Sequence, residues 1–558
     1  MSERLIYLPL GGAGEIGMNA YVYGYGAPGK ERLILVDLGV TFGDMDSSPG
    51  IDLIMPDLSW LVDNRDRLEG IFITHGHEDH LGAVGHLWAR LGVPIYARQF
   101  TGALCRLKLE EMGHPADTVK ITGPRPEVTR LGPFTVQFVP VSHSIPESAA
   151  LVIDTPAGRV VHTGDFKLDG TPVVGERFDP EMWHDIANEG RGIKALTCDS
   201  TNVFSTHPGR SEAVLANPIT EWVLAQKNMV IATTFASNIA RLKTLAEAAI
   251  AADRKVCLLG RAMRRMVSVG LETGVLTDFP NTIGPDEAAG LPRNKVMLLV
   301  TGSQGERRAA SAQLSRGRYL GLSLKEGDSF LFSSKTIPGN ERSVGRIMNA
   351  LSEMGIDLYD GDDGLFHVSG HANRPDIEAL HDLLKPEIVI PMHGEHMHLR
   401  EHMTIARSKG IASSVATNGM MVELTGEAPK VVDQVETGRL YLDGNVLIGS
   451  MDGIVRDRIR MALNGHALVS VIVDEDDNPL PDAWVEISGL PGRSRGGEDL
   501  AAHIEGELAE FLESADRKTA RDDAKIEEAV RKITRQVSME EIGKKPEVTV
   551  IISRLMAE

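Results

Sequence analysis

Residues 74–80, with the sequence THGHEDH, concentrate side chains that bind metal ions. They directly follow an apolar run that is predicted to be a strand. Imidazole nitrogens suit zinc, iron and manganese, and a carboxylate adds a hard oxygen ligand. His75 and His77 can face one ion, while Asp79 and His80, further along the chain, can face a second. The segment therefore predicts a metal site at a strand end, in preference to a solvated polar turn.

Such a site needs further ligands, and three candidates follow apolar strands predicted elsewhere: His143, Asp165 and His393. Gly164 would let the backbone before Asp165 approach an ion closely. Strand ends are where α/β folds gather functional groups. Other histidines are interpreted as surface, helix or outer residues rather than ligands: His86, His162, His396 and His398.

The spacing H-x-H-x-D-H resembles the signature of the metallo-β-lactamase superfamily. In that superfamily the later ligands come in the order His, Asp, His, which the three candidates match. The resemblance implies two divalent ions, zinc in the first place and manganese as the alternative. The ligand set it implies is His75, His77 and His143 for one ion, Asp79, His80 and His393 for the other, and Asp165 as the bridge.

A glycine motif near the N-terminus points to a different function, but its context does not support it. Residues 12–17 fit G-x-G-x-x-G, and Asp37 lies where a dinucleotide-binding fingerprint has an acidic residue. The next segments, 19–25 and 32–37, are aromatic and β-branched, which predicts a hairpin. A hairpin offers no helix N-terminus to a pyrophosphate, so we expect no nucleotide cofactor. Asp37, at a strand end, is predicted to lie behind the metal ligands and to orient them without binding the ion itself.

Composition indicates a large enzyme with ample core. The chain has 558 residues, of which 42% are hydrophobic, and is expected to form two to four domains. No apolar run reaches the roughly 18 to 20 residues that span a bilayer, and the first residues lack the layout of a secretory signal. Three cysteines that lie far apart suggest reduced thiols. We therefore expect a cytoplasmic protein without a membrane partner.

The formal net charge of −20 argues, as an average, against a polyanionic substrate. Phosphate contacts, however, need only a local cationic surface. Arginines cluster in the middle of the chain, where each cluster alone is more typical of a solvated helix face: Arg261, Arg264 and Arg265; Arg307 and Arg308; Arg316 and Arg318.

The positions of the ligands predict the domain layout. Residues 1–211 alternate strands and helical stretches, typical of an αββα sandwich. Residues 212–365 contain apolar strands that fit a parallel sheet with its own helices, and they separate His393 from the other ligands. The chain then returns to the first domain over residues 366–450. Residues 451–558 predict a small α+β domain of three strands and two charged helices.

The inserted domain carries a second resemblance. Nucleases of the β-CASP group have an acidic residue at a strand end, then an insertion, then a motif S-[GA]-H before the last metal-binding histidine. Asp199 and the motif that ends at His371 match this order. Segments 301–306 (TGSQGE) and 333–341 (SSKTIPGNE) are similar to the bacterial ribonuclease J family, and the resemblance covers about residues 5–450.

That resemblance implies a metal-dependent ribonuclease of RNA processing and decay. It would be a 5′-to-3′ exonuclease that prefers 5′-monophosphate ends, with additional endonuclease activity. Two ions about 3.5 to 4 Å apart would supply a hydroxide that attacks phosphorus. Asp79 would orient this hydroxide. His371, its tautomer fixed by Asp199, would stabilise the developing charge or protonate the leaving oxygen.

The family also has a pocket for the RNA 5′-phosphate and a C-terminal domain that supports self-association. The resemblance therefore implies a homodimer or homotetramer. Ser237 and Asn238 taken alone are equally typical of a helix N-cap. The residues that match the phosphate pocket are Ser237, Asn238, Ser369, Gly370 and His371.

Three alternatives remain open from the sequence. A β-CASP DNA nuclease would keep the same motifs. A metallohydrolase of the glyoxalase or lactamase kind would share the metal motif, but it has no use for the insertion or for His371. A degenerate RNA-binding subunit would have lost ligands, whereas every expected ligand is present.

Overall fold

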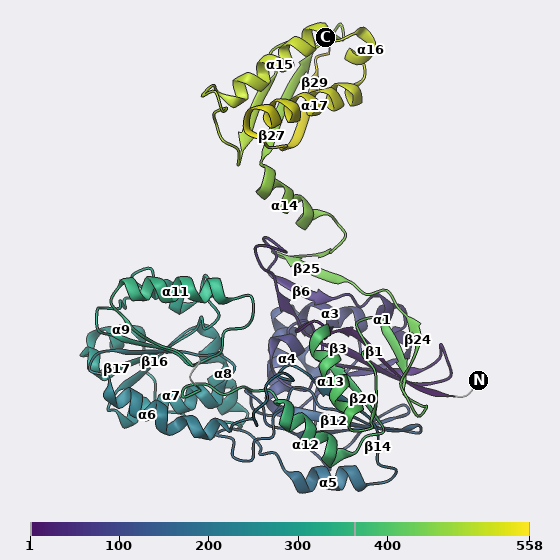
Figure 1. The fold of residues 1–558 in the computed structure, drawn as a ribbon, viewed down its shortest axis with the longest axis vertical. Coiled ribbons are helices and arrows are strands. Elements are labelled where there is room, and N and C mark those ends of the chain that lie inside the picture. The colour runs from purple at the N-terminus through teal and green to yellow at the C-terminus, as the bar shows by residue number, and fades with distance from the viewer. Residues whose placement is uncertain (1–2, 362–363, 557–558) are drawn as a thin grey trace. The chain divides into compact units, whose positions relative to one another are not determined.

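The computed structural model describes residues 3–361 and 364–556. Their contacts divide the chain into two compact units. The first consists of Met1–Thr41 with Met55–Arg439, and the second of Phe42–Ile54 with Leu440–Glu558. The elements of both units are labelled in Figure 1.

An eight-stranded sheet forms one layer of the first unit, in the order β24-β23-β1-β3-β4-β7-β8-β9. Strands β1, β3 and β4 pair antiparallel, and β4, β7, β8 and β9 continue the sheet in parallel. The strands are β1 (Arg4–Gly11), β3 (Ala20–Gly26), β4 (Arg32–Val36), β7 (Leu68–Phe72), β8 (Ile95–Ala97), β9 (Val119–Ile121), β23 (Met420–Glu423) and β24 (Lys430–Gln434).

A seven-stranded sheet forms the second layer, in the order β10-β11-β12-β13-β14-β20-β22. Strands β13, β14, β20 and β22 run parallel, so their carboxyl ends meet at one edge. The strands are β10 (Thr129–Leu131), β11 (Phe134–Pro140), β12 (Ala149–Thr155), β13 (Gly158–His162), β14 (Ile193–Asp199), β20 (Ile388–Met392) and β22 (Ala412–Ser413).

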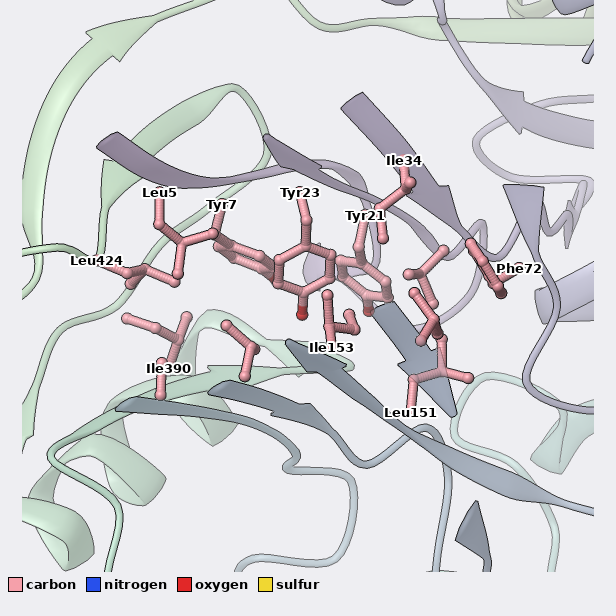
Figure 2. Close-up of a cluster of buried hydrophobic side chains, with 14 of the residues drawn as sticks. Leu5, Tyr7, Tyr21, Tyr23, Ile34, Phe72, Leu151, Ile153, Ile390 and Leu424 are labelled. Carbon is pink, nitrogen blue, oxygen red and sulfur yellow. The ribbon is translucent and has the colours of Figure 1, made fainter. Parts of the chain in front are cut away.

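The core between these sheets is rich in tyrosine (Figure 2). Tyr7, Tyr21 and Tyr23 come from the first sheet and are fully buried against side chains such as Leu151 and Ile390 of the second. Each aromatic side chain removes about 150 to 250 Å² from water when it is buried. This packing holds the two sheets face to face and fixes how their edges meet.

Helices cover the outer faces of both sheets, which confirms the predicted αββα sandwich (Figure 1). Apolar residues of the helices on the second sheet join one buried cluster with that sheet. The helices over the first sheet are α1 (Ser59–Asp63), α3 (Val84–Leu91) and α4 (Gln99–Glu111); those over the second are α5 (Pro180–Asn188), α12 (Arg374–Leu384) and α13 (His396–Ser408).

The insertion forms a five-stranded sheet in the order β16-β17-β15-β18-β19, parallel throughout as predicted. Its central strands are buried on both faces, which explains their unbroken apolar sequences. The strands are β15 (Val230–Thr233), β16 (Lys255–Leu259), β17 (Val296–Val300), β18 (Ser329–Phe332) and β19 (Asp357–Tyr359). The helices are α6 (Ala216–Ala225), α7 (Ile239–Ala251), α8 (Arg261–Glu272), α9 (Pro285–Gly290), α10 (Ala310–Leu314) and α11 (Glu341–Glu353).

The N-terminal glycine motif lies between β1 and β3, which pair antiparallel, and the predicted hairpin follows it as β3 and β4. It contains the short strand β2 (Ala13–Gly14), which pairs with β21 (Gly394–Glu395) directly after His393. The motif therefore connects the start of the chain to a turn of the metal centre, and it does not open a helix.

The second unit contains the predicted small α+β domain. Val469 and Val471 of its sheet, β28-β27-β29, share a core with Ile504 and Val530 of the helices. Its elements are β5 (Thr41–Phe42), β6 (Leu53–Pro56), β25 (Arg439–Asp443), β26 (Val446–Gly449), α14 (Ile454–Asn464), β27 (His466–Val473), β28 (Trp484–Ser488), α15 (Leu500–Ser514), α16 (Arg517–Ala520), α17 (Asp523–Ile542) and β29 (Glu547–Arg554). Within the two described stretches, no helix combines the length and the apolar character needed to cross a bilayer.

Candidate metal centre

Turns at the ends of strands from both sheets bring seven histidine and aspartate side chains together. His75 and His77 lie in the loop after β7, and Asp79 and His80 lie in the short helix α2 (Glu78–Leu81). The other three follow β11, β13 and β20: they are His143, Asp165 and His393.

The first group of ligand atoms consists of three imidazole nitrogens and one carboxylate oxygen. His77 Nδ1 is 3.2 Å from His75 Nε2 and 3.1 Å from His143 Nε2. Asp165 Oδ2 is 3.8 Å from His75 Nε2 and 3.7 Å from His143 Nε2. These atoms surround one point at distances that fit a bound ion.

The second group uses the same oxygen of Asp165. This atom is 3.2 Å from His80 Nε2 and 3.3 Å from His393 Nε2. Asp79 Oδ2 completes the group, at 3.5 Å from His80 Nε2 and 3.7 Å from His393 Nε2. Asp165 therefore belongs to both groups, as a bridging ligand would.

Three of the histidines form hydrogen bonds through the ring nitrogen that faces away from the ligand groups, and these bonds determine where the ring is protonated. His143 Nδ1 donates to the carbonyl of Gly370 at 2.6 Å, and His80 Nδ1 donates to Asp37 Oδ2 at 2.7 Å. His393 Nδ1 donates to Asn19 Oδ1 at 2.9 Å. Nδ1 therefore carries a proton in each ring and Nε2 faces the ligand groups, where a bound ion would take the place of a proton, as in metal-binding histidines.

Two of these contacts depend on special features of the backbone: the absence of a Cβ at Gly370 and a positive φ at His393. A Cβ at Gly370 would lie 2.9 Å from the His143 ring, so only glycine lets this carbonyl come so close. His393 itself has a φ of +50°, a conformation that costs of the order of 1–3 kcal/mol outside glycine. Its backbone N–H donates to the carbonyl of Gly12 at 2.9 Å, which helps to hold the turn.

The protonation states of the ligand side chains favour the binding of a cation. Burial lowers the pKa of His75 and His143 well below the ordinary value and that of His77 to about 4. Burial alone would raise the pKa of Asp165, but His393 and His80 hold it well below its usual range. The first group is therefore three neutral imidazoles around a carboxylate.

An orphaned atom provides an independent test of whether a cation fits. Asp165 Oδ1 is buried and has no hydrogen-bond partner. An unpaired buried carboxylate oxygen is costly, and a cation beside it would remove that cost. The nitrogen and oxygen donors are those preferred by zinc and related divalent ions, so the residues fit the predicted metal.

His371 and Asp199 lie at the edge of the ligand groups. His371 Nδ1 donates to Asp199 Oδ2 at 2.8 Å, and the His371 ring centre is 4.9 Å from that of His143. Burial disfavours the charged ring, but the carboxylates of Asp199 and Asp165 outweigh it and raise the pKa of His371 to about 9. The His371 side chain is 22% exposed, so a substrate can reach it.

The predicted phosphate-binding residues occupy different places. Ser369 Oγ accepts hydrogen bonds from Asn202 Nδ2 at 2.7 Å and from the backbone N–H of His371 at 3.1 Å, and Ser369 lines a cavity of about 230 Å³. Asn238 caps α7 by accepting from the backbone N–H of Arg241 at 2.9 Å. Asn238 and Ser237 are not among the residues that line the cavity.

Sequence reasoning missed two features of the site. Asn19 was not singled out, although its Nδ2 donates to the carbonyl of Asp79 at 2.9 Å and its Oδ1 holds His393. Nor was the basic lining of the cavity, which includes Arg210 and Lys335. Lys335 lies in segment 333–341, which the sequence singled out, but only the fold brings it, Arg210 and Asn19 to the site.

Fold and site together define a metallohydrolase of the metallo-β-lactamase superfamily with a β-CASP insertion. Family models match successive parts of the chain: the metallo-beta-lactamase superfamily at residues 14–222, the beta-CASP domain of ribonuclease J at 227–351, the Zn-dependent metallo-hydrolase RNA specificity domain at 365–413, and the ribonuclease J C-terminal domain at 453–555.

Whole-chain relatives agree with these matches. Ribonuclease J of Sinorhizobium meliloti is 40% identical over 99% of this chain and 98% of its own length. Ribonuclease J 1 of Streptococcus pyogenes is 36% identical over 83% and 82%. A solved structure from Enterococcus faecalis V583, described as a protein of unknown function, shares the fold over 75% of this chain and 100% of its own, with a TM-score of 0.52 at 16% identity. The chain belongs to the ribonuclease J family.

Proposed function

We propose that the protein degrades RNA from 5′-monophosphate ends in the 5′-to-3′ direction and also cuts RNA internally. Family membership makes it a metal-dependent ribonuclease. The end preference and the internal cleavage are the proposal. One observation supports hydrolysis at this centre most: two adjacent ligand groups share Asp165, and His371 lies at their accessible edge.

The ligand groups are proposed to hold two divalent cations, zinc first and manganese as the alternative. His75, His77 and His143 would hold one, and Asp165 would be shared. The second group would be completed by Asp79, His80 and His393. When bound, such a pair supplies Lewis acidity, which lowers the pKa of water toward 7 and offsets charge on the oxygens of a phosphoryl group.

The protein's own groups orient the reactants. The carboxylate of Asp79 can accept a hydrogen bond from an attacking water, because its side chain is 31% exposed. The Nε2 of His371 remains available to the substrate, since Nδ1 is bound to Asp199. From that position His371 can stabilise charge on the phosphate or give a proton to the leaving oxygen.

The 5′-phosphate is proposed to bind in the cavity beside Ser369. This cavity is basic, because Arg210 and Lys335 line it. The pKa of His367, another lining residue, is lowered to about 3 by burial and by nearby cations that include Lys335. Burial disfavours a charge of either sign, whereas the neighbouring cations, Arg241, Lys335 and Lys167, favour an anion. Ser237 and Asn238, at the N-terminal end of α7, stay part of the proposed phosphate-binding set with Ser369, Gly370 and His371.

The assembly and the location are also proposals. The C-terminal domain is proposed to support a homodimer or homotetramer. Three free, buried cysteines suit a reducing compartment, which favours the cytoplasm: Cys105, Cys198 and Cys257.

The substrate class and the metal requirement are tested by incubating the purified full chain with RNA and with single-stranded DNA of the same sequence, each with and without a chelator. We expect RNA hydrolysis that stops on chelation and returns when Zn²⁺ or Mn²⁺ is added. DNA digestion at the rate of RNA would favour the β-CASP DNA nuclease instead. Hydrolysis that survives metal removal would contradict the two-cation site.

A further inference from the structure

A second cluster of metal-binding side chains is buried on the outer side of the second sheet. Cys198 comes from the end of β14, His381 from α12 and His402 from α13. One ligand atom of each residue lies within 4.8 Å of the others. All three side chains are buried, among apolar residues of the sheet and the two helices.

The two histidines are arranged as neutral ligands. His381 Nε2 and His402 Nε2 are 3.1 Å apart, and the two rings are inclined by 22°. His402 Nδ1 is 2.9 Å from Ser200 Oγ, which itself can donate to the carbonyl of Cys198. When Ser200 donates to that carbonyl, His402 Nδ1 donates to Ser200 and His402 Nε2 carries a lone pair. Burial lowers the pKa of His402 well below normal and that of His381 to about 4, so neither ring is charged.

A hydrogen bond between the rings explains only part of this cluster. His381 Nε2 could donate to His402 Nε2, but His381 Nδ1 is buried and has no partner. A buried polar atom without a partner costs about 1–3 kcal/mol, and this atom stays unpaired whether His381 Nε2 holds a proton or an ion. The hydrogen bond between the rings does not involve the thiol of Cys198, which interacts with the side chain of Thr163 and whose pKa is raised well above its usual range by burial and by Asp199.

We infer that Cys198, His381 and His402 form a structural binding site for one thiophilic divalent cation of the zinc type. One sulfur and two imidazole nitrogens are ligands that zinc prefers. Nitrogens bound at about 2.0–2.1 Å to a tetrahedral ion lie about 3.3 Å apart. The observed 3.1 Å is close to this value. The thiol gives its proton to solvent when the ion binds, and a water molecule completes the coordination.

The ion would join three elements that surround the candidate metal centre. Cys198 is followed by Asp199, which accepts the hydrogen bond from His371. Helix α13 begins shortly after His393. A cation held by β14, α12 and α13 would therefore stabilise the outer layer behind the centre without contacting substrate.

Cobalt substitution of the full-length protein distinguishes this site from the seven-residue centre. That centre offers only nitrogen and oxygen ligands. A thiolate-to-Co²⁺ charge-transfer band in the near ultraviolet therefore reports a cysteine ligand. We expect this band in the wild-type protein loaded with Co²⁺ to saturation, together with one more metal ion per chain than in Cys198→Ser.

Variants assign the band to these residues. Cys198→Ser and His381→Leu should both lose it, and the second keeps every cysteine, so it serves even if the first fails to fold. Cys105→Ser is the matched control, because Cys105 is also buried but lies on α4, and it should keep the band. A wild-type protein that shows no band at saturating Co²⁺, or a band that persists in Cys198→Ser, would overturn the inference.

Discussion

Asp79 differs from the bridging residue Asp165 in its access to solvent. The Asp79 side chain is 31% exposed, whereas that of Asp165 is 2% exposed. Asp165 must therefore be held and neutralised by its neighbours, while Asp79 can meet a water or a phosphate. Substitutions at Asp79 and at Asp165 are therefore expected to have different effects on the enzyme.

Asp79→Asn should abolish turnover but preserve RNA binding. The amide cannot supply the anionic oxygen that orients water, and such a loss costs about 10²- to 10⁴-fold in kcat. The dissociation constant for RNA should stay within a few-fold of wild type. Single-turnover kinetics and a binding titration measure the two quantities.

Glu78→Gln is the matched control for this variant, since Glu78 is the neighbouring acidic residue and its carboxylate pairs with Lys108 at 2.8 Å. It should keep nearly full turnover. Joint loss of affinity and turnover in Asp79→Asn would show that Asp79 mainly holds the structure.

Asn19→Ala should weaken metal binding although Asn19 is not a predicted ligand. It removes the acceptor of His393 Nδ1 and the donor to the carbonyl of Asp79. Loss of such an outer contact lowers metal affinity by about 10- to 100-fold. Metal retained after dialysis against a metal buffer measures the change.

Tyr21→Phe provides the graded comparison, because the Tyr21 hydroxyl donates to the same Asn19 oxygen at 2.7 Å and meets the ligand His393 only at its backbone. It should have a smaller effect. Equal metal retention in Asn19→Ala and wild type would refute a positioning role for Asn19.

Among the elements, the loop after β18 carries a basic residue, Lys335, into the cavity beside Ser369. Lys335→Gln should raise KM for 5′-monophosphate RNA by about three- to tenfold, because an exposed cation contributes modestly. The rate on circular RNA should not change, since it has no end to bind. A uniform loss on both substrates would place Lys335 in general RNA binding.

Most elements of the fold were predictable because their sequences have a clear pattern. The parallel strands of the insertion are unbroken apolar runs, and the segments at β3 and β4 have strong β propensity. The histidines and aspartates at strand ends could be found in the sequence because each follows an apolar run. Their roles as ligands remain predictions.

Contacts between distant segments could not be predicted in this way. Asn19 holds His393 only because β1 and β3 bring it to the end of β20. The segment Phe42–Ile54 groups with Leu440–Glu558, although nothing in its sequence indicates this. Such contacts depend on the pairing of whole elements, which a single sequence does not reveal.

For the whole molecule, self-association can be tested on the outer face of the C-terminal sheet. Trp484 and Ile551 both pair with Ser470 across this sheet, so they lie on one face, 53% and 45% exposed. Trp484→Glu combined with Ile551→Glu should shift the protein to a single chain of 60.5 kDa in light scattering. Met539→Glu, on α17 and 47% exposed, should not. An unchanged mass in the double variant would contradict the assignment of this face.

The most direct test of the proposed function compares one RNA sequence in three forms: linear with a 5′-monophosphate, linear with a 5′-triphosphate, and circular. Products are followed over time with the wild-type enzyme and its metals. We predict mononucleotides released from the 5′ end of the monophosphate form first, slower attack on the triphosphate form, and occasional internal cuts in the circle. Equal rates on both linear forms, with fragments unrelated to the 5′ end, would contradict the account.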